Sequence, residues 1–141
     1  MASFDIRGVL ETCLYASDLD QSEDFYTRVL KLKLFIKNPE RHLFYRCGDS
    51  MLMLFNPDET RNKQSVVNGS SVPSHGAIGP GHAAFKVRLS EMDQWRDWLI
   101  RHDVEIESEV DWPSGGHSIY FRDPTNNCLE LASPGIWNLA E

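Results

Sequence analysis

The two halves of this chain carry the same order of local patterns, and this repetition constrains its fold more than any other feature. In the first half, a strand-like run precedes a helical pattern and three further strand-like runs: Val9–Ala16, a helix beginning near Asp18, Lys33–Lys37, His42–Cys47 and Met51–Phe55. The second half gives the same order at His82–Arg88, Glu91–His102, Val104–Glu109, Ser118–Arg122 and Cys128–Ala132. The repetition predicts two βαβββ modules in tandem.

The repeat also holds residue by residue, with offsets that change only in loops. Glu11 aligns with His82 at an offset of 71 residues, and Phe44 aligns with Phe121 at an offset of 77. Insertions between repeats belong in loops, so this small drift is expected. Chance similarity between two amphipathic stretches is the alternative, and the ordered match of strands and helices makes it the weaker interpretation.

The length of 141 residues suits a single compact domain over residues 1–141. We expect an α+β fold in which module one covers about residues 7–57 and module two covers residues 81–135. The two modules should form one curled mixed sheet around a cup, with the helices outside. The linker at 58–80 is rich in Asn, Ser, Gly and Pro, and a loop of this length is usually a lid, a binding loop or a tether.

The charge and the cysteines narrow the class of partner. The formal net charge of −7 argues against a nucleic-acid partner, because phosphate binding needs clustered Lys and Arg. The first residues show no signal-peptide pattern, and no apolar run approaches the thickness of a membrane. The three cysteines are widely spaced, which disfavours a disulfide framework or a structural zinc site. We expect a cytoplasmic protein that handles a small molecule.

The strands have one apolar face and a second face of unusual composition. A solvated face normally carries several Lys, Thr, Ser or Glu residues. The second face here instead carries mostly apolar and aromatic side chains: Cys13, Tyr15, Met51, Met53, Phe55, Ala84 and Ala132. This composition predicts the lining of a cavity.

Three polar side chains on the same face are candidate metal ligands: Glu11, His82 and Glu130. The repeat makes Glu11 equivalent to His82, and Met53 equivalent to Glu130. A pseudo-twofold axis between the modules would bring these positions together. One imidazole and two carboxylates suit a divalent ion such as Zn, Ni, Mn, Fe or Co. An exposed glutamate and an ordinary hydrogen-bonded histidine are the alternatives for each residue alone. Met53 should line the cup without binding the ion.

These segments also carry a family likeness. The run LETCLYASDLDQSEDFYTRVLKLKL resembles the opening module of vicinal-oxygen-chelate proteins, and GHAAFKV and GGHSIYFRDPTNNCLELAS resemble their closing module. The superfamily includes glyoxalase I, fosfomycin-modifying enzymes, extradiol dioxygenases and bleomycin-sequestering proteins. The resemblance covers nearly the whole chain except the linker, and it implies a metal-holding cup made by two βαβββ modules.

The resemblance also implies roles for individual residues. Glu11, His82 and Glu130 match the positions of the metal ligands, whereas Met53 stands where glyoxalase I has a fourth ligand, which disfavours that enzyme. The stretch His117–Phe121 is similar to a hairpin of the fosfomycin enzymes in which a Ser and a Tyr contact substrate. This similarity implies that Ser118 and Tyr120 contact substrate, with Tyr45 near their counterpart in module one.

The leading hypothesis is an enzyme in which the ion acts as a Lewis acid on an oxygen-bearing substrate. Glu130 would move a proton, and Tyr120 would be a second catalytic group. The other candidate substrate-binding residues are Tyr15, Tyr45, Met53, Phe55, His75, Lys86 and Ser118, with His75 supplied by the linker. Lyase, isomerase, transferase and dioxygenase chemistry stay open. The alternative is a metal-free protein that sequesters a drug. By analogy with the family, we expect a homodimer.

Overall fold

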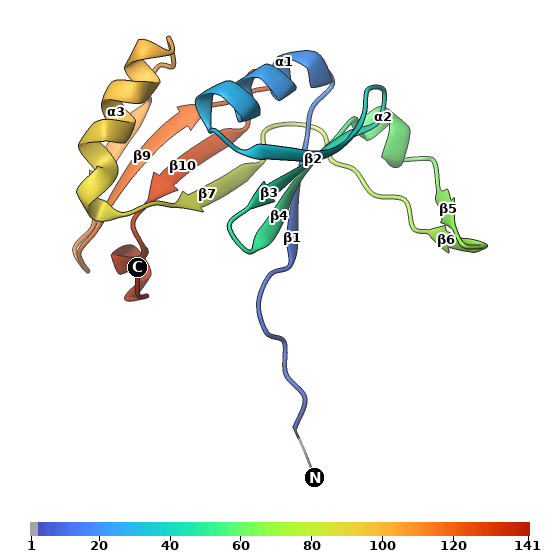
Figure 1. Cartoon of the computed structure of the whole chain (residues 1–141), viewed down its shortest axis with the longest axis horizontal. Helices are drawn as coiled ribbons and strands as arrows, with labels where there is room; N and C mark the ends of the chain where they lie inside the picture. Colours follow the sequence, from blue (N-terminus) through green and yellow to red (C-terminus); the bar gives the residue numbers. More distant parts are fainter. Residues whose placement is uncertain (1–2) are drawn as a thin grey trace.

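A computed structural model describes residues 3–141 and contains the two predicted modules (Figure 1). Module one consists of β1 (Glu11–Tyr15), α1 (Leu19–Asp24), the π-helix η1 (Phe25–Val29), β2 (Lys33–Asn38), β3 (His42–Cys47) and β4 (Ser50–Phe55). Module two consists of β7 (His82–Lys86), η2 (Leu89–Glu91), α3 (Met92–Arg101), β8 (Ser108–Asp111), β9 (His117–Arg122) and β10 (Cys128–Ala132), and a short helix η3 (Pro134–Trp137) follows it.

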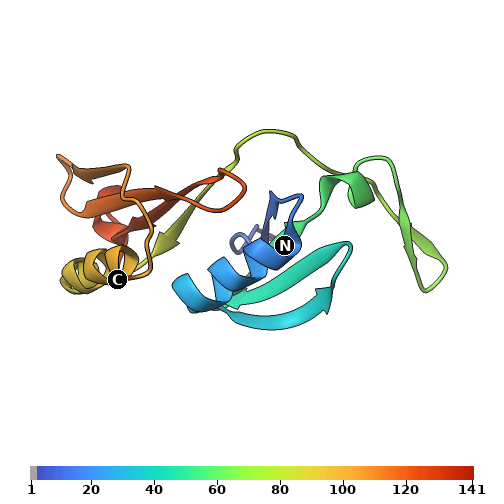
Figure 2. The ribbon, with the colours of Figure 1, turned by 90° about the horizontal axis from the view of Figure 1, so that it is seen from above.

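Each module has its own four-stranded mixed sheet with the same topology. The strand orders are β1-β4-β3-β2 and β7-β10-β9-β8, and the first strand of each module runs parallel to the last. Figure 2 shows the modules side by side, joined by the segment that leads into β7. The single curled sheet that we expected is not seen in one chain, because β1 and β7 are each an edge strand of a separate sheet.

The strand registers confirm most of the predicted repeat and correct one part of it. Glu11 lies opposite Met51 just as His82 lies opposite Cys128, which agrees with the offsets of the first and last strands. In the third strand, however, Phe44 lies opposite Met53 and Tyr120 lies opposite Glu130. Phe44 therefore corresponds to Tyr120, and the predicted match with Phe121 is wrong by one residue. A slip of one residue moves a strand side chain to the opposite face.

The helix of module one begins where its sequence provides a cap. The Asp18 carboxylate accepts a hydrogen bond from the backbone N–H of Gln21 at 3.0 Å, which satisfies one of the free donors of the first turn. The helical pattern then continues through η1, whose buried side chains Phe25, Tyr26 and Val29 face the sheets.

The two modules share one hydrophobic core, in which their helix-covered sides meet. Phe25 of module one packs against Phe121 of module two, with ring centroids 6.3 Å apart. The Tyr26 hydroxyl donates to Asp123 at 2.6 Å, and the indole N–H of Trp98 donates to the Val29 carbonyl at 2.8 Å. Because these contacts join the helical sides, the other face of each sheet is left uncovered.

Two parts of the chain differ from the sequence prediction. The segment Val104–Glu109 was expected to be a strand, but the strand β8 begins only at Ser108. Val104 and Ile106 do pack against the core, so their alternation reports burial of an extended segment rather than a hydrogen-bonded ladder. The linker contains the short helix α2 (Pro57–Thr60) and a hairpin of β5 (Ser65–Val67) and β6 (Ser70–Val72).

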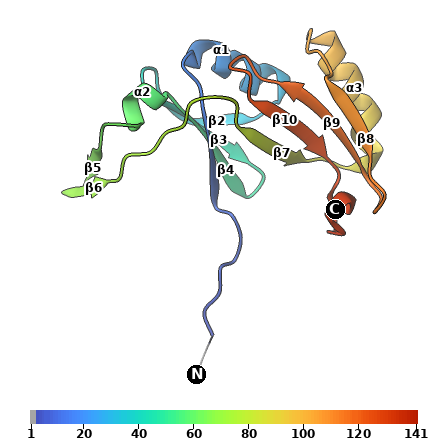
Figure 3. The same cartoon turned by 180° about the vertical axis from the view of Figure 1, so that it is seen from behind.

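No helix within residues 3–141 has the length and apolar character needed to cross a membrane. Residues 3–10 extend away from the body of the fold as a single segment (Figures 1 and 3). Four large apolar side chains in this arm are mostly exposed: Phe4, Ile6, Val9 and Leu10.

A charged cluster on the helix side of module two predicts a dependence of stability on pH. His117 lies 2.8 Å from Glu109 and 2.7 Å from Asp111, and Glu109 also pairs with Arg96. Burial opposes the charge on His117, but the two carboxylates outweigh it and raise the pKa of His117. A raised pKa stabilises the fold fully below the unfolded-state value of about 6.5, and this stabilisation is lost as the pH rises through the folded value.

We therefore expect the free energy of unfolding of the wild type, minus that of His117→Gln, to fall as the pH rises above about 6.5. Urea unfolding of both proteins between about pH 5 and pH 9 measures this difference. His102→Gln is the control, since His102 contacts Arg28 rather than a carboxylate. A difference that stays constant or grows with pH would contradict the assignment.

Candidate metal centre

His82 and Glu130 form a close pair on the uncovered face of module two. His82 is the first residue of β7, and Glu130 is the middle residue of the neighbouring strand β10. Their Nε2 and Oε1 atoms are 3.3 Å apart. The imidazole is about half exposed, whereas only 6% of the glutamate side chain is accessible to solvent. The pair thus combines a buried glutamate with a histidine that solvent and ligands can reach.

The orientation of the imidazole is set by the backbone of β10. The Nδ1 atom of His82 lies 2.9 Å from the carbonyl oxygen of Cys128, the residue opposite it in the parallel ladder. Since a carbonyl oxygen only accepts, the hydrogen must be on Nδ1. In a neutral imidazole the Nε2 atom then carries a lone pair and faces the glutamate.

The other oxygen of Glu130 is fixed by two consecutive hydrogen bonds from buried or partly buried donors. The Ser118 hydroxyl donates to Oε2 of Glu130 at 2.5 Å, and the indole N–H of Trp112 donates to the Ser118 hydroxyl at 2.9 Å. Ser118 is completely buried. Its predicted contact with substrate stays a prediction, and in the structure its hydroxyl orients the Glu130 carboxylate. Trp112 was not singled out from the sequence, since nothing local links it to a strand six residues away.

Tyr120 shares this face and completes the cluster. It lies opposite Glu130 in the antiparallel ladder, and its ring stacks near the imidazole of His82 with centroids 6.4 Å apart. Burial, and after it the negative charge of Glu130, raises the pKa of the Tyr120 phenol. The phenol therefore stays a hydrogen-bond donor at neutral pH, beside the carboxylate.

The donor set of this pair fits a divalent cation. Nε2 of His82 and Oε1 of Glu130 face each other across 3.3 Å, and in the neutral imidazole both atoms are acceptors. A cation between or beside them would satisfy both. The hydrogen bonds from Nδ1 to a carbonyl and from Ser118 to Oε2 are of the kind that orient metal ligands in proteins.

Glu11 does not reach this pair within one chain. It is exposed at the start of β1, on the uncovered face of module one. Among residues 3–141, no group of three His, Cys, Asp or Glu side chains is close enough to hold one ion. A single chain thus presents two of the three predicted ligands together and the third on its other module.

Glu11 instead lines a groove of about 870 Å³ on module one. Cys13, Tyr15, Met53 and Phe55 also line it, as their predicted strand face requires. The linker supplies His75, whose Nδ1 lies 2.7 Å from the Tyr15 hydroxyl. Its ring meets Phe55 edge-on, with centroids 4.7 Å apart. The linker therefore brings His75 to the uncovered face of module one, against Tyr15 and Phe55, and its predicted contact with a substrate stays a prediction.

The structure places two predicted residues elsewhere. Tyr45 is completely buried on the helix side, where its hydroxyl lies 3.1 Å from Thr27 Oγ1 and 3.3 Å from the Glu23 carbonyl. It is a core residue because the register differs by one from the predicted alignment. Lys86 lies at the far end of β7 from His82, in a depression with Glu91 and Trp95. Side chains four residues apart on a strand are about 13 Å apart, so Lys86 is not beside His82.

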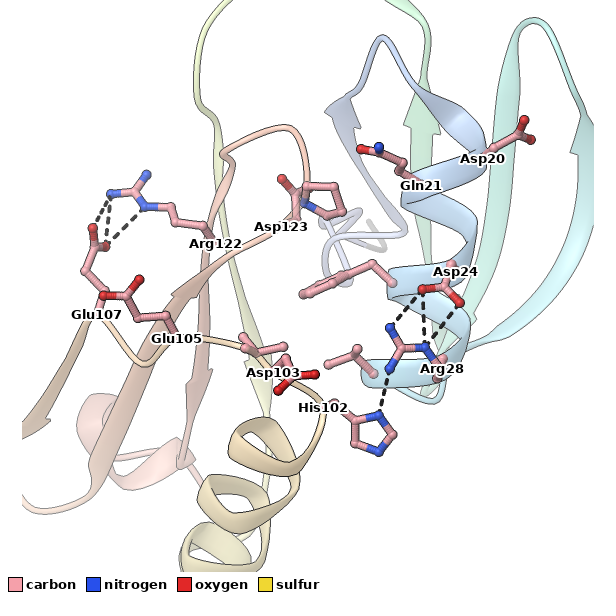
Figure 4. A pocket seen from close by; sticks show the side chains of 14 residues that line it. Asp20, Gln21, Asp24, Arg28, His102, Asp103, Glu105, Glu107, Arg122 and Asp123 are labelled. Atoms are coloured by element: carbon pink, nitrogen blue, oxygen red, sulfur yellow. Dashed lines mark hydrogen bonds and ion pairs between the residues drawn. The ribbon is translucent and has the colours of Figure 1, made fainter.

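A second cavity, of about 680 Å³, lies between α1 and the loop after α3 (Figure 4). Its charged side chains largely satisfy one another, as in the pairs Arg28–Asp24 and Arg122–Glu107. None of the predicted site residues lines it. It is a groove between the packed modules and lies apart from the metal centre.

The fold and this cluster define a class of protein that comparison with known proteins confirms. Residues 8–131 match the model of the glyoxalase/bleomycin resistance protein/dioxygenase superfamily, and the chain belongs to this superfamily. It is similar to a crystal structure of lactoylglutathione lyase from Agrobacterium tumefaciens, with 36% identity, a TM-score of 0.87 and coverage of 95% of this chain and 98% of that one.

Two further proteins are similar to this chain. The metallothiol transferase FosB of Staphylococcus saprophyticus is 27% identical over 127 residues, which cover 89% of this chain and 76% of the transferase. The fosfomycin resistance protein FosX of Listeria monocytogenes has a TM-score of 0.67 at 18% identity, with coverage of 95% and 98%, and its structure contains Mn(II). The relatives thus include enzymes and a metal-binding protein.

Proposed function

We propose that this chain is a divalent-metal-dependent enzyme that acts on a small oxygen-bearing molecule, with each metal site built from two copies of the chain. The observation that carries the proposal is the His82–Glu130 pair. Its two facing acceptor atoms are 3.3 Å apart, and its remaining polar atoms are already held by Cys128 and Ser118. Such an arrangement is expected of two side chains oriented to bind one cation.

The third ligand in this proposal is Glu11 of a second copy. Both β1 and β7 are edge strands, and they begin with Glu11 and His82. An edge strand exposes unpaired backbone groups that favour pairing with another strand. The exposed arm with Phe4 and Ile6 leads directly into β1 and supplies apolar surface for such a contact. Pairing β1 of one copy with β7 of the other would give the curled sheet and the complete cup in a homodimer.

The bound ion, which we propose is Zn, Ni, Mn, Fe or Co, would polarise an oxygen of the substrate as a Lewis acid. Glu130 would accept or return a proton through Oε1 only when that oxygen is displaced from the ion, while Ser118 holds its other oxygen. Tyr120 keeps its proton and would donate a hydrogen bond to the substrate. Tyr15 and His75 would bind the substrate from the module-one side of the cup. Two relatives bear the names of a lyase and a transferase, which supports an enzyme without selecting the reaction.

A mixing experiment tests the composite site. Full-length Glu11→Ala and His82→Ala chains, carrying different tags, are unfolded and refolded together, and the mixed dimer is purified through both tags. Because one site of this dimer combines the intact Glu11 of one chain with the intact His82 of the other, we expect half the zinc or manganese content of the wild type. Each variant alone should bind almost none.

The reciprocal mixture is the control. A dimer of the wild type with the Glu11→Ala/His82→Ala double variant has no complete composite site, so it should bind almost no metal. Metal in this control but none in the first mixture would show that the site lies within one chain. A protein that is monomeric while binding one ion per chain would equally contradict the proposal.

The second candidate function is sequestration of a drug without a metal. The observation in its favour is the groove of module one, whose lining is mainly aromatic and apolar, including Phe44 and Phe55. Elemental analysis of the purified wild type separates the two functions, since this alternative requires no bound ion and no loss on substitution of His82.

A further inference from the structure

Arg41 places a cation in the groove of module one, which the β5–β6 hairpin also lines. The hairpin projects beside the module (Figure 1) and contributes Val67 and Val72 to the groove, and the segment after it contributes His75. Arg41 belongs to the turn between β2 and β3. Its side chain is partly buried, and it lines the same groove as Tyr15 and Phe55.

The backbone of Arg41 is anchored on both sides. Its N–H donates to the Asn38 carbonyl at 3.0 Å, and its carbonyl accepts from the N–H of Asn56 at 2.9 Å. The guanidinium carbon lies 5.3 Å from the centre of the Phe55 ring, and Nη1 donates to Nδ1 of His42 at 2.9 Å. An arginine has five N–H donors, so most of this fork is left for a ligand.

Arg41 has no carboxylate partner in the described chain, although the protein is acidic. No Asp or Glu oxygen among residues 3–141 lies within 4.0 Å of its guanidinium. An acid pairs with each of Arg28, Arg61, Arg88, Arg96 and Arg122. Arg46 and Arg101 resemble Arg41 in having no such partner within the described residues, but they do not line the groove. Burial, and after it the charge of Arg41, lowers the pKa of His42, so His42 stays neutral and adds no charge. Glu11 also lines this groove, but it does not pair with Arg41 and is assigned to the ion in the proposed metal site, so Arg41 remains a cation that attracts an anion.

The groove beside this cation offers flat aromatic surfaces. His42 stacks on Phe44 with ring centroids 4.0 Å apart and an interplanar angle of 10°, and Phe55 meets Phe44 at 67°. Together with Tyr15, these rings give the groove an aromatic lining that favours a planar apolar group by stacking and edge contacts. Charge and shape therefore point to one kind of ligand.

We propose that this groove binds a small aromatic acid, with its carboxylate held by the Arg41 fork and its ring between the aromatic side chains of β1, β3 and β4. The inference deepens the proposed function, since this groove is the module-one half of the composite cup. It makes Arg41 a specificity-determining residue that selects anionic substrates, through the bidentate geometry that arginine offers to a carboxylate.

Titration with benzoate, followed by amide chemical shifts of the full-length protein, is the test. We expect saturable binding with the largest shifts at groove residues. Benzamide and acetate should bind at least about 10-fold more weakly, because each lacks one half of the recognition. Arg41→Gln should weaken benzoate binding by at least about 10-fold. Arg46→Gln is the matched control. Arg46 lies in β3, the strand that follows Arg41, where its guanidinium stacks on Phe35 and does not line the groove.

His82→Ala separates this inference from the metal proposal. The variant should keep the affinity of the wild type for benzoate, since Arg41 rather than an ion holds the anion. Loss of binding in His82→Ala with unchanged binding in Arg41→Gln would mean that benzoate binds a metal, and it would overturn the inference while supporting the metal site. Equal affinity for benzamide, an equal effect of Arg46→Gln, or no saturable binding would also overturn it.

Discussion

Replacing His82 with alanine should remove nearly all metal from the purified protein. The hydrogen bond from Nδ1 of His82 to the Cys128 carbonyl directs Nε2 of His82 toward Glu130, 3.3 Å away, where it can bind an ion. Loss of a second-shell partner typically lowers metal affinity by about 10–100-fold, so loss of a ligand should lower it by at least about 100-fold. Elemental analysis after dialysis, and competition with a chromogenic chelator, measure the change.

His102→Ala is the matched control for this experiment. His102 lies at the end of α3 on the helix side, where it contacts Arg28 and the ring of Trp98. Its removal should leave metal content unchanged. The melting temperatures of both variants show whether either one has lost its fold. Wild-type metal content in a folded His82→Ala protein would remove His82 from the site.

Replacing Asp123 with alanine should cost about 3 kcal/mol or more of unfolding free energy. Asp123 is buried in the turn before β10, and its carboxylate accepts four hydrogen bonds. The donors are the Tyr26 hydroxyl, the backbone N–H groups of Thr125 and Asn127, and the Asn127 amide. Burial, and after it the charge of Asp123, raises the pKa of Tyr26, so its hydroxyl stays a donor. Alanine would leave these buried donors without a partner.

Urea unfolding measures this loss, and two further variants calibrate it. Tyr26→Phe removes one donor and leaves the other three, so it should cost only about 1 kcal/mol. Glu105→Ala removes an exposed acid and should change stability by less than about 0.5 kcal/mol. If Asp123→Ala costs no more than Glu105→Ala, the junction between the modules does not depend on this carboxylate.

The repeat was readable from the sequence because strand and helix periodicities are local. β3 and β10 have the predicted bounds, and the ladder brings His82 beside Glu130 as the strand alignment required. The wrong prediction for Tyr45 came from the alignment of a single strand. Tyr45 was misplaced because a shift of one residue in β3 exchanges its faces, and aromatic residues at 44 and 45 make both registers look acceptable.

The His82–Glu130 pair follows from the sequence alone, since neighbouring strands of one module bring these residues together. The position of Glu11 relative to that pair depends on how the two modules pack. Contacts of the helical sides, such as Phe25 with Phe121 and Tyr26 with Asp123, decide this packing. Such contacts join residues roughly a hundred positions apart and leave no periodic trace in either segment. Only the tertiary structure therefore shows that, within one chain, Glu11 and the His82–Glu130 pair lie on the uncovered faces of two separate sheets and do not meet.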